Sequence, residues 1–282
     1  MDRRQAILDY YADSHIDYLM IWGTFRHYAL HYGYHDAAHR GLNAAVLNMN
    51  RQVAERLRVR PGMHLLDAGC GIGGTSIWMA RERQAQLTAV NISAFQIERG
   101  RRLVARLGLS DRVRFLERSF TDTGEPDAGY EGIFGMESVS YAEDKRDFLR
   151  EAFRLLKPGG RLVLTDGWEN DIDPRRGASA EYDEWLRCWA VPNLWGYDRI
   201  QRDARDAGFV EVAMEDATPR VMPSARRMHL AAKYLAPGAK LLQWMRVRNR
   251  VQNQNVRAAY LQYRCLRDGS WRYGILSATK PG

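Results

Sequence analysis

Residues 67–73 combine one acidic side chain with three glycines at alternate positions, in the pattern D-x-G-x-G-x-G. The pattern lies between a predicted strand at 63–67 and a segment with helical periodicity, so we expect a strand-to-helix turn. Glycines there let the backbone turn tightly and let a ligand approach it closely, while the following helix offers free N–H groups. The spacing differs from the dinucleotide pattern G-x-G-x-x-G, and the lysine of a phosphate loop is missing.

Two later patterns follow in order along the chain. A periodic segment from residue 148 ends at Leu-Lys-Pro-Gly-Gly (156–160), and the chain closes with Ser-Ala-Thr-Lys-Pro (277–281). Together with the glycine pattern they resemble class I S-adenosylmethionine-dependent methyltransferases over residues 40–282; the alternative is a glycine-rich turn in an unrelated α/β protein. The resemblance implies a Rossmann-like, mostly parallel sheet with an antiparallel last strand. It also implies S-adenosylmethionine as cofactor, with Asp67, Gly69 and Gly71 beside its methionine and ribose portions.

The second predicted strand ends in Asn91, where most members of that family carry an acidic residue for the ribose hydroxyls. An asparagine still offers a donor and an acceptor to a diol. The pattern N-I-S-x-x-Q (91–96) resembles the sterol, tocopherol, cyclopropane-fatty-acid and prenyl-diphosphate methyltransferases, although Ser93 also fits a simple helix N-cap. The resemblance places further cofactor contacts at Asn91, Ile92 and Gln96, and at Ser119 and Phe120 near the adenine.

Glu137 follows the fourth predicted strand, 133–136, in the sequence Glu-Ser-Val-Ser-Tyr. Residues just beyond the carboxyl ends of strands line the ligand crevice of an α/β sheet. Glu137 and Tyr141 resemble the Glu-Ser-x-x-Tyr of geranyl diphosphate C-methyltransferases, in which the matching glutamate is the base after methyl transfer. An alkene that takes up a methyl group becomes a carbocation, which a carboxylate can stabilise and deprotonate. The alternative role for Glu137 is a helix cap or an ion-pair partner.

The N-terminal region carries His27, His31, His35 and His39 at intervals of four residues. Gly33 argues against one uninterrupted helix through them, and no cysteine joins them, so we do not predict a metal site. The motif His-Tyr-Gly-Tyr (31–34) resembles the segment that precedes the glycine loop in the same relatives. Tyr32 and His39 are therefore candidate substrate contacts, with Trp185 of a tryptophan-rich insertion as a third and Tyr34 and Trp195 as further aromatic candidates for shielding a cation.

The formal net charge of +8 is unevenly distributed: residues 217–282 carry +12 and the remaining 216 residues carry −4. A cationic cap over the crevice suits an anionic substrate, since arginine binds phosphate oxygens in a bidentate manner. Arg226 and Arg227 are the candidates for this contact, although a solvated helix face or a subunit contact is the better explanation for most single arginines.

These observations favour C-methylation of an alkene in an isopentenyl- or geranyl-type diphosphate, for which Mg²⁺ is a candidate second cofactor. One alternative is C-, N- or O-methylation of an aromatic or alkaloid-type natural product. Another is a nucleic-acid-binding module on this scaffold, but the basic segment lacks the interleaved aromatic residues of a stacking surface, and we expect no nucleic-acid partner. A homo-oligomer is left open.

Alternation of strand-like and helix-like segments from residue 62 onward predicts an α/β fold. We expect an N-terminal helical cap at 1–60 and a core at 61–282, with inserted helical caps near 170–195 and 219–262. No apolar run reaches the roughly 20 residues of a membrane span, the first residues do not form a secretory signal, and three unpaired cysteines fit a reducing compartment. We therefore expect a cytoplasmic protein.

Overall fold

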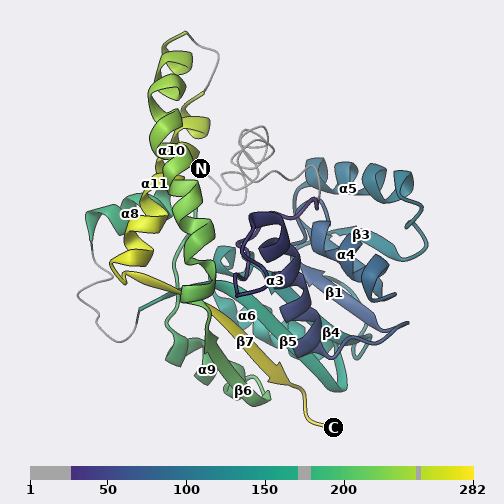
Figure 1. The fold of residues 1–282 in the computed structure, drawn as a ribbon. Helices are drawn as coiled ribbons and strands as arrows, with labels where there is room; N and C mark the ends of the chain where they lie inside the picture. Colours follow the sequence, from purple (N-terminus) through teal and green to yellow (C-terminus); the bar gives the residue numbers. More distant parts are fainter. Residues whose placement is uncertain (1–26, 171–178, 246–248) are drawn as a thin grey trace.

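The computed structural model describes residues 27–170, 179–245 and 249–282 (Figure 1). This part of the chain is built on a seven-stranded sheet of order β3-β2-β1-β4-β5-β7-β6. Neighbours from β3 to β5 pair in parallel, whereas β7 is antiparallel to β5 and to β6. The strands are β1 (His64–Ala68), β2 (Gln86–Asn91), β3 (Val113–Glu117), β4 (Tyr130–Met136), β5 (Leu156–Glu169), β6 (Val210–Asp216) and β7 (Trp271–Thr279). The predicted mostly parallel α/β sheet with an antiparallel last strand is confirmed.

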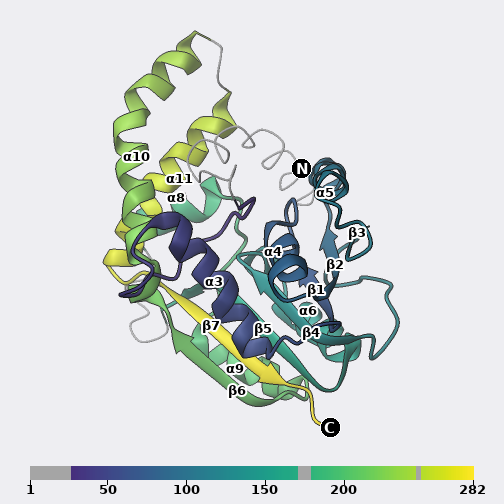
Figure 2. The same ribbon diagram turned by 45° about the vertical axis from the view of Figure 1, so that its right-hand side comes forward.

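Helices cover both faces of the sheet, because successive strand residues point to opposite sides. Leu65 belongs to the apolar core shared with α3, α4 and α5, whereas its neighbour Leu66 belongs to the core shared with α6 and α9. Figure 2 shows α3 lying across the face of the sheet, where it packs on β5 and β4. These helices are α3 (Leu42–Leu57), α4 (Gly74–Glu82), α5 (Ala94–Arg106), α6 (Lys145–Leu155) and α9 (Tyr197–Asp206).

The N-terminal cap is less helical than expected. Residues 27–40 form no helix, and α3 begins only at Leu42; the expectation for residues 1–26 lies outside the described residues. Gly33 explains part of the difference, because a Cβ at this position would lie 2.6 Å from the Cβ of Ala45. The 27–40 segment therefore runs as an irregular strap held closely against α3.

The two expected inserted caps join into one helical layer. The first contains α8 (Ala180–Cys188), and the second consists of two helices, α10 (Thr218–Trp244) and α11 (Arg250–Arg267). Helices α10 and α11 pack on each other, α8 packs on α11, and the α10–α11 hairpin projects from the sheet (Figure 1). Within the described ranges, no helix is long and apolar enough to cross a membrane.

Candidate active site

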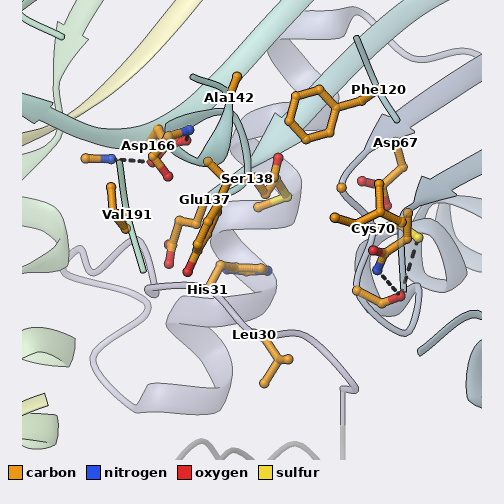
Figure 3. Close-up of a pocket in the computed structure, with 18 of the residues that line it drawn as sticks. Leu30, His31, Asp67, Cys70, Phe120, Glu137, Ser138, Ala142, Asp166 and Val191 are labelled. Atoms are coloured by element: carbon orange, nitrogen blue, oxygen red, sulfur yellow. Dashed lines mark hydrogen bonds between the residues drawn. The ribbon is translucent and has the colours of Figure 1, made fainter. Parts of the chain in front are cut away.

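A cavity of about 730 Å³ opens at the carboxyl ends of β1, β2, β4 and β5 and reaches the strap and α8. Sequence reasoning named twelve of the residues that line it. They are Tyr32, Asp67, Gly69, Gly71, Asn91, Ile92, Gln96, Ser119, Phe120, Glu137, Tyr141 and Trp185. In Figure 3, Asp67 and Phe120 lie on one side of this cavity, and Glu137 and Asp166 lie on the other. The fold thus brings the predicted cofactor residues and the predicted catalytic residues to a common space.

The glycine loop shapes the cofactor side of the cavity. Gly69 and Gly71 have positive φ angles of 85° and 57°, which glycine adopts without strain. A Cβ on Gly69 would lie 2.4 Å from the Cβ of Ser138, whereas a Cβ on Gly71 would meet no protein atom within 4 Å. Gly69 is therefore required for protein packing, and Gly71 leaves open space beside the backbone where a ligand can approach.

Asp67 is a buried carboxyl near the end of β1, just before this loop. It accepts a hydrogen bond of 2.7 Å from the Ser76 hydroxyl, and burial raises its pKa to about 7. A cationic ligand beside it would favour the charged form. This acid suits the positively charged S-adenosylmethionine.

Asn91 and Gln96 form a pair at the end of β2. The Asn91 amide donates to the Gln96 side-chain oxygen at 2.8 Å and to the Gly71 carbonyl at 3.1 Å, and Asn91 Oδ1 accepts from the Ser93 N–H. Ser93 also caps α5, as expected, by accepting from the Gln96 N–H. With its oxygen used by Asn91, Gln96 keeps its NH₂ group as a donor for a bound ribose diol.

Glu137 is held by two donors on one of its two oxygens. The Tyr32 N–H and the Tyr273 hydroxyl donate to Oε1 at 2.7 and 2.8 Å. Among the described residues, no hydrogen bond is made to Oε2. The pKa of Glu137 is raised to about 8; burial is the main cause, the nearby Asp166 acts in the same direction, and the two donors act against it. Oε2 is thus the oxygen that can take a proton from a ligand.

The backbone of Glu137 is strained. Its φ angle is 53°, in the left-handed region that non-glycine residues rarely adopt. Its N–H donates to the Thr165 carbonyl at 2.7 Å, which anchors this conformation to β5. Strain of this kind persists where the surrounding structure enforces it and is concentrated at functional sites.

A third buried carboxyl, Asp166, lies at the same edge of the sheet. It accepts from the N–H groups of Ser140 and Gly167 at 2.9 and 2.8 Å, and burial raises its pKa to about 6. Nearby Lys145 is also buried and donates to the carbonyls of Ala142 and Asn193. Asp166 thereby fixes the loop that follows Glu137.

Aromatic rings form the wall around Glu137. Tyr32 meets Tyr273 edge to face at 5.6 Å, and Trp185 stacks on Trp271 at 4.8 Å between ring centroids. Trp189, 5.7 Å from Trp185, extends the wall. Such ring faces stabilise a nearby cation.

Sequence reasoning missed Asp166, Trp271 and Tyr273. Asp166 directly follows the predicted strand 161–165, as Glu137 follows 133–136, so the rule that found one acid could have found the other. The two aromatic residues, Trp271 and Tyr273, lie at the start of antiparallel β7, where Trp271 pairs with Glu169 and Tyr273 with Gly167. The rule for parallel strands gave no signal for residues at the start of a strand.

The structure does not bring three predicted substrate contacts to this cavity. His39 lies outside the lining and bonds Asp36 and Arg51. Arg226 and Arg227 are exposed on α10, whose buried face includes Val221, Ala225 and Met228. A helix can turn only one side to the protein, and this one turns its apolar side inward. Tyr34 and Trp195 are likewise absent from the lining.

The cavity is therefore acidic. Its described lining contains one arginine, Arg118, and no lysine. The acidic side chains of the lining are Asp67, Glu117, Asp122, Glu137, Glu143, Asp144, Asp147 and Asp166. No group of three or more metal-ligating His, Cys, Asp or Glu side chains occurs in the described part of the chain. The lining thus matches a cationic cofactor.

The sheet order, the glycine turn after β1 and the acidic cavity at the strand ends define a class I methyltransferase fold. The family model described as "Methyltransferase domain" matches residues 65–160. Among curated proteins, methyltransferase GfsG of Streptomyces halstedii is 36% identical over 214 residues, covering 74% of this chain and 75% of the relative. The 27-O-demethylrifamycin SV methyltransferase of Amycolatopsis mediterranei (strain S699) is 30% identical over 221 residues, covering 75% of this chain and 76% of the relative.

Among solved structures, one of geranyl diphosphate C-methyltransferase from Streptomyces coelicolor A3(2), in complex with Mg²⁺, geranyl diphosphate and S-adenosyl-L-homocysteine, matches with a TM-score of 0.75. It is 23% identical, and the match covers 99% of this chain and 98% of that one. The chain belongs to the S-adenosylmethionine-dependent methyltransferases.

Proposed function

We propose that this methyltransferase transfers a methyl group to an alkene carbon of an isoprenoid. The observation that carries the proposal is Glu137, a buried and strained carboxyl whose Oε2 receives no hydrogen bond from the described residues. Transfer to a nitrogen or oxygen nucleophile that already carries a lone pair leaves no carbocation. An alkene acceptor, in contrast, needs a base for the proton lost afterwards.

S-adenosylmethionine, when bound, supplies an electrophilic methyl group that the two π electrons of the alkene attack, so that a carbocation forms on the neighbouring substrate carbon. Glu137 Oε2 then removes a proton from a carbon adjacent to the cation. The electrons of that C–H bond form the new double bond, and the proton stays on the carboxyl. The Tyr32 N–H and the Tyr273 hydroxyl hold the other oxygen throughout.

The aromatic wall supports the same step. Tyr32, Trp185, Trp271 and Tyr273 line the cavity and contact one another. Their rings exclude water, which would otherwise trap the cation as an alcohol, and their faces lower its energy.

We extend the proposal to a prenyl diphosphate of isopentenyl or geranyl type as the substrate class. Its support is the fold likeness to the geranyl diphosphate C-methyltransferase over nearly the whole chain. Arg226 and Arg227 lie outside the cavity lining, and Arg118 is the basic side chain that the described lining offers. We assign no step to a magnesium ion, and the experiment below compares acceptors with and without the anionic head group.

A second candidate is O-methylation of a hydroxyl on a natural product. It is favoured by the curated relatives, which include the 27-O-demethylrifamycin SV methyltransferase and an O-methyltransferase resE that is 28% identical. Glu137 Oε2 would then deprotonate the hydroxyl as it attacks.

The decisive experiment supplies methyl-labelled S-adenosylmethionine with three sets of acceptors: prenyl diphosphates, the matching prenyl alcohols, and phenolic or macrolide alcohols. Nuclear magnetic resonance of the product identifies a new carbon–methyl or oxygen–methyl bond. We expect a carbon–methyl bond on a prenyl acceptor and loss of that product in Glu137→Gln. Turnover confined to alcohols, with oxygen–methyl products, would replace the proposal by the second candidate.

A further inference from the structure

A second cavity, of about 690 Å³, lies between α8, α10 and α11. Its lining shares no residue with the active-site cavity. The lining residues are Glu184, Arg187 and Cys188 of α8, Ala232, Lys233, Ala236 and Ala239 of α10, and Arg250, Asn253, Gln254, Val256, Arg257 and Tyr260 of α11. No step of the proposed reaction uses this second cavity.

The floor of the second cavity is apolar. On α10, Ala232, Ala236 and Ala239 follow one another at helical spacing, and small side chains there leave room between the helices. Ala232, Ala239 and Val256 are buried, at 1%, 8% and 7% exposure. A floor of this kind contacts a hydrocarbon chain without burying polar groups.

The rim of the second cavity is cationic. Arg187, Lys233 and Arg250 are exposed side chains at its edge, contributed by three different helices. Neither α10 nor α11 contains a single acidic residue. Arg187 has acidic neighbours on α8, among them Glu184, whereas Lys233 and Arg250 have none on their own helices. Positive charges of this kind at the edge of a cavity attract an anion.

Arg257 forms an ion pair with Glu184, and an anionic ligand could replace the Glu184 carboxylate in it. The Arg257 guanidinium donates to both oxygens of Glu184, each at 2.9 Å, and this pair joins α11 to α8 beside the cavity. Glu184 is the acid of the described lining. A phosphate or carboxylate entering the cavity offers the same fork-to-fork geometry to Arg257.

From the apolar floor and the cationic rim we propose that the α8–α10–α11 cavity is a second binding site, which takes an anionic amphiphile: one apolar chain with a phosphate or carboxylate head group. The chain lies on the alanine floor, and the head group contacts Lys233, Arg250 and Arg257. An inorganic anion would leave the floor uncovered, and a neutral chain would leave the rim unpaired.

Helix α8 separates the two sites and makes contact with both. Trp185 lines the active-site cavity, while Glu184 and Arg187, its neighbours on the helix, line the second one. The Trp189 indole N–H donates to Asn255 of α11 at 3.1 Å. Binding in the second cavity therefore changes the surroundings of two tryptophans, which provides an optical signal.

The test titrates the full-length protein, saturated with S-adenosylhomocysteine, with decyl phosphate below its micelle concentration, by calorimetry and tryptophan fluorescence. Decanol and inorganic phosphate are titrated separately, and phosphatidylglycerol vesicles are tested by co-sedimentation. We expect decyl phosphate to bind about tenfold or more tightly than decanol or phosphate. Binding to vesicles alone would assign the basic residues to a lipid surface and overturn the site.

Three sets of substitutions test whether decyl phosphate binds in the second cavity. Lys233→Ser with Arg250→Ser should weaken decyl phosphate by about tenfold or more, because two charge-assisted contacts are lost. Arg226→Ser with Arg227→Ser removes the same charge from exposed positions outside the cavity and should leave the affinity unchanged. Ala236→Trp fills the floor and should abolish binding while cofactor affinity, the folding control, is kept. Equal affinity in the wild type and the Lys233/Arg250 variant would refute the proposal.

Discussion

Replacing Glu137 by glutamine tests the proposed chemistry most directly. The substitution keeps one role of this side chain, accepting hydrogen bonds, and removes the other, taking up a proton. A glutamine oxygen can still accept from the Tyr32 N–H and the Tyr273 hydroxyl, so the loop and its strained backbone are retained. The amide cannot take a proton. We expect kcat to fall by roughly 10²–10⁴-fold, the usual contribution of a positioned base, with little change in KM for the cofactor.

The pH dependence gives the same test in the wild-type enzyme. Burial raises the pKa of Glu137 to about 8, so roughly one carboxyl in ten is charged at about pH 7 and roughly nine in ten at about pH 9. The kcat/KM for S-adenosylmethionine, which reports the free enzyme, should therefore rise about tenfold between these values. At saturating cofactor the inflection in kcat should lie lower, because the sulfonium cation favours the carboxylate.

The assay is initial-rate transfer of labelled methyl groups from about pH 6 to about pH 10, with product identification at each point. Glu98→Gln is the matched control, because Glu98 is exposed on α5 and pairs only with its neighbour Arg102 among the described residues. A Glu137→Gln enzyme with wild-type kcat and the same alkene product would refute the assignment of the base. A flat kcat/KM profile would refute the role of the buried carboxyl as well.

Four further outcomes are expected. Tyr273→Phe removes a donor to the charged carboxylate; the pKa of Glu137 should rise and the pH–rate profile should move to higher pH, as initial rates would show. Gly71→Ala should fold, with a cost of about 1 kcal/mol for the left-handed backbone, but calorimetry should show weak cofactor binding. Gly69→Ala, in contrast, should unfold at a clearly lower temperature, because the added Cβ collides with Ser138. Arg226→Ser with Arg227→Ser should leave KM for prenyl acceptors unchanged. Burial raises the pKa values of Asp166, Asp67 and Glu137 to about 6, 7 and 8. The stability that these carboxyls contribute is complete below their pKa values in the unfolded chain and is lost as the pH rises through their folded values. Thermal melts of the cofactor-free protein should therefore show a melting temperature that falls with rising pH, less steeply for Glu137→Gln.

Much of the fold could be predicted because the strands alternate between two cores. The inner strands place neighbours such as Leu65 and Leu66 in opposite apolar layers, which produces short continuous apolar runs bounded by turns. The predicted strand at 161–165 is the centre of a longer strand, Leu156–Glu169. Its extension follows from pairing with β7, and such pairing between residues over a hundred positions apart leaves no local signal.

The site was predictable where chemistry depends on local sequence. The glycine turn, Asn91 with Gln96, and Glu137 each occupy a defined place after a strand, and each lines the cavity. A count of charges does not say which face of a helix is turned inward, so it could not show that Arg226 and Arg227 lie outside the cavity lining. The basic segment also has structural partners: Arg257 and Arg264 form ion pairs with Glu184 and Glu181 of α8.

The acidity of the cavity can be explained by following the charges through the proposed reaction. The bound cofactor contributes a positive sulfur, which becomes neutral when the methyl group leaves, and the positive charge passes to a substrate carbon. Proton transfer to Glu137 then removes one positive charge from the substrate and one negative charge from the protein. The total charge inside the cavity is unchanged, so no step requires separating charge in a poorly solvated space. With neutral product cofactor beside it, a carboxyl whose pKa is raised by burial retains the proton. In the proposed reaction, most Glu137 side chains at about pH 7 therefore return to the charged form as the product leaves and the next sulfonium binds. This would couple reactivation of the base to cofactor exchange.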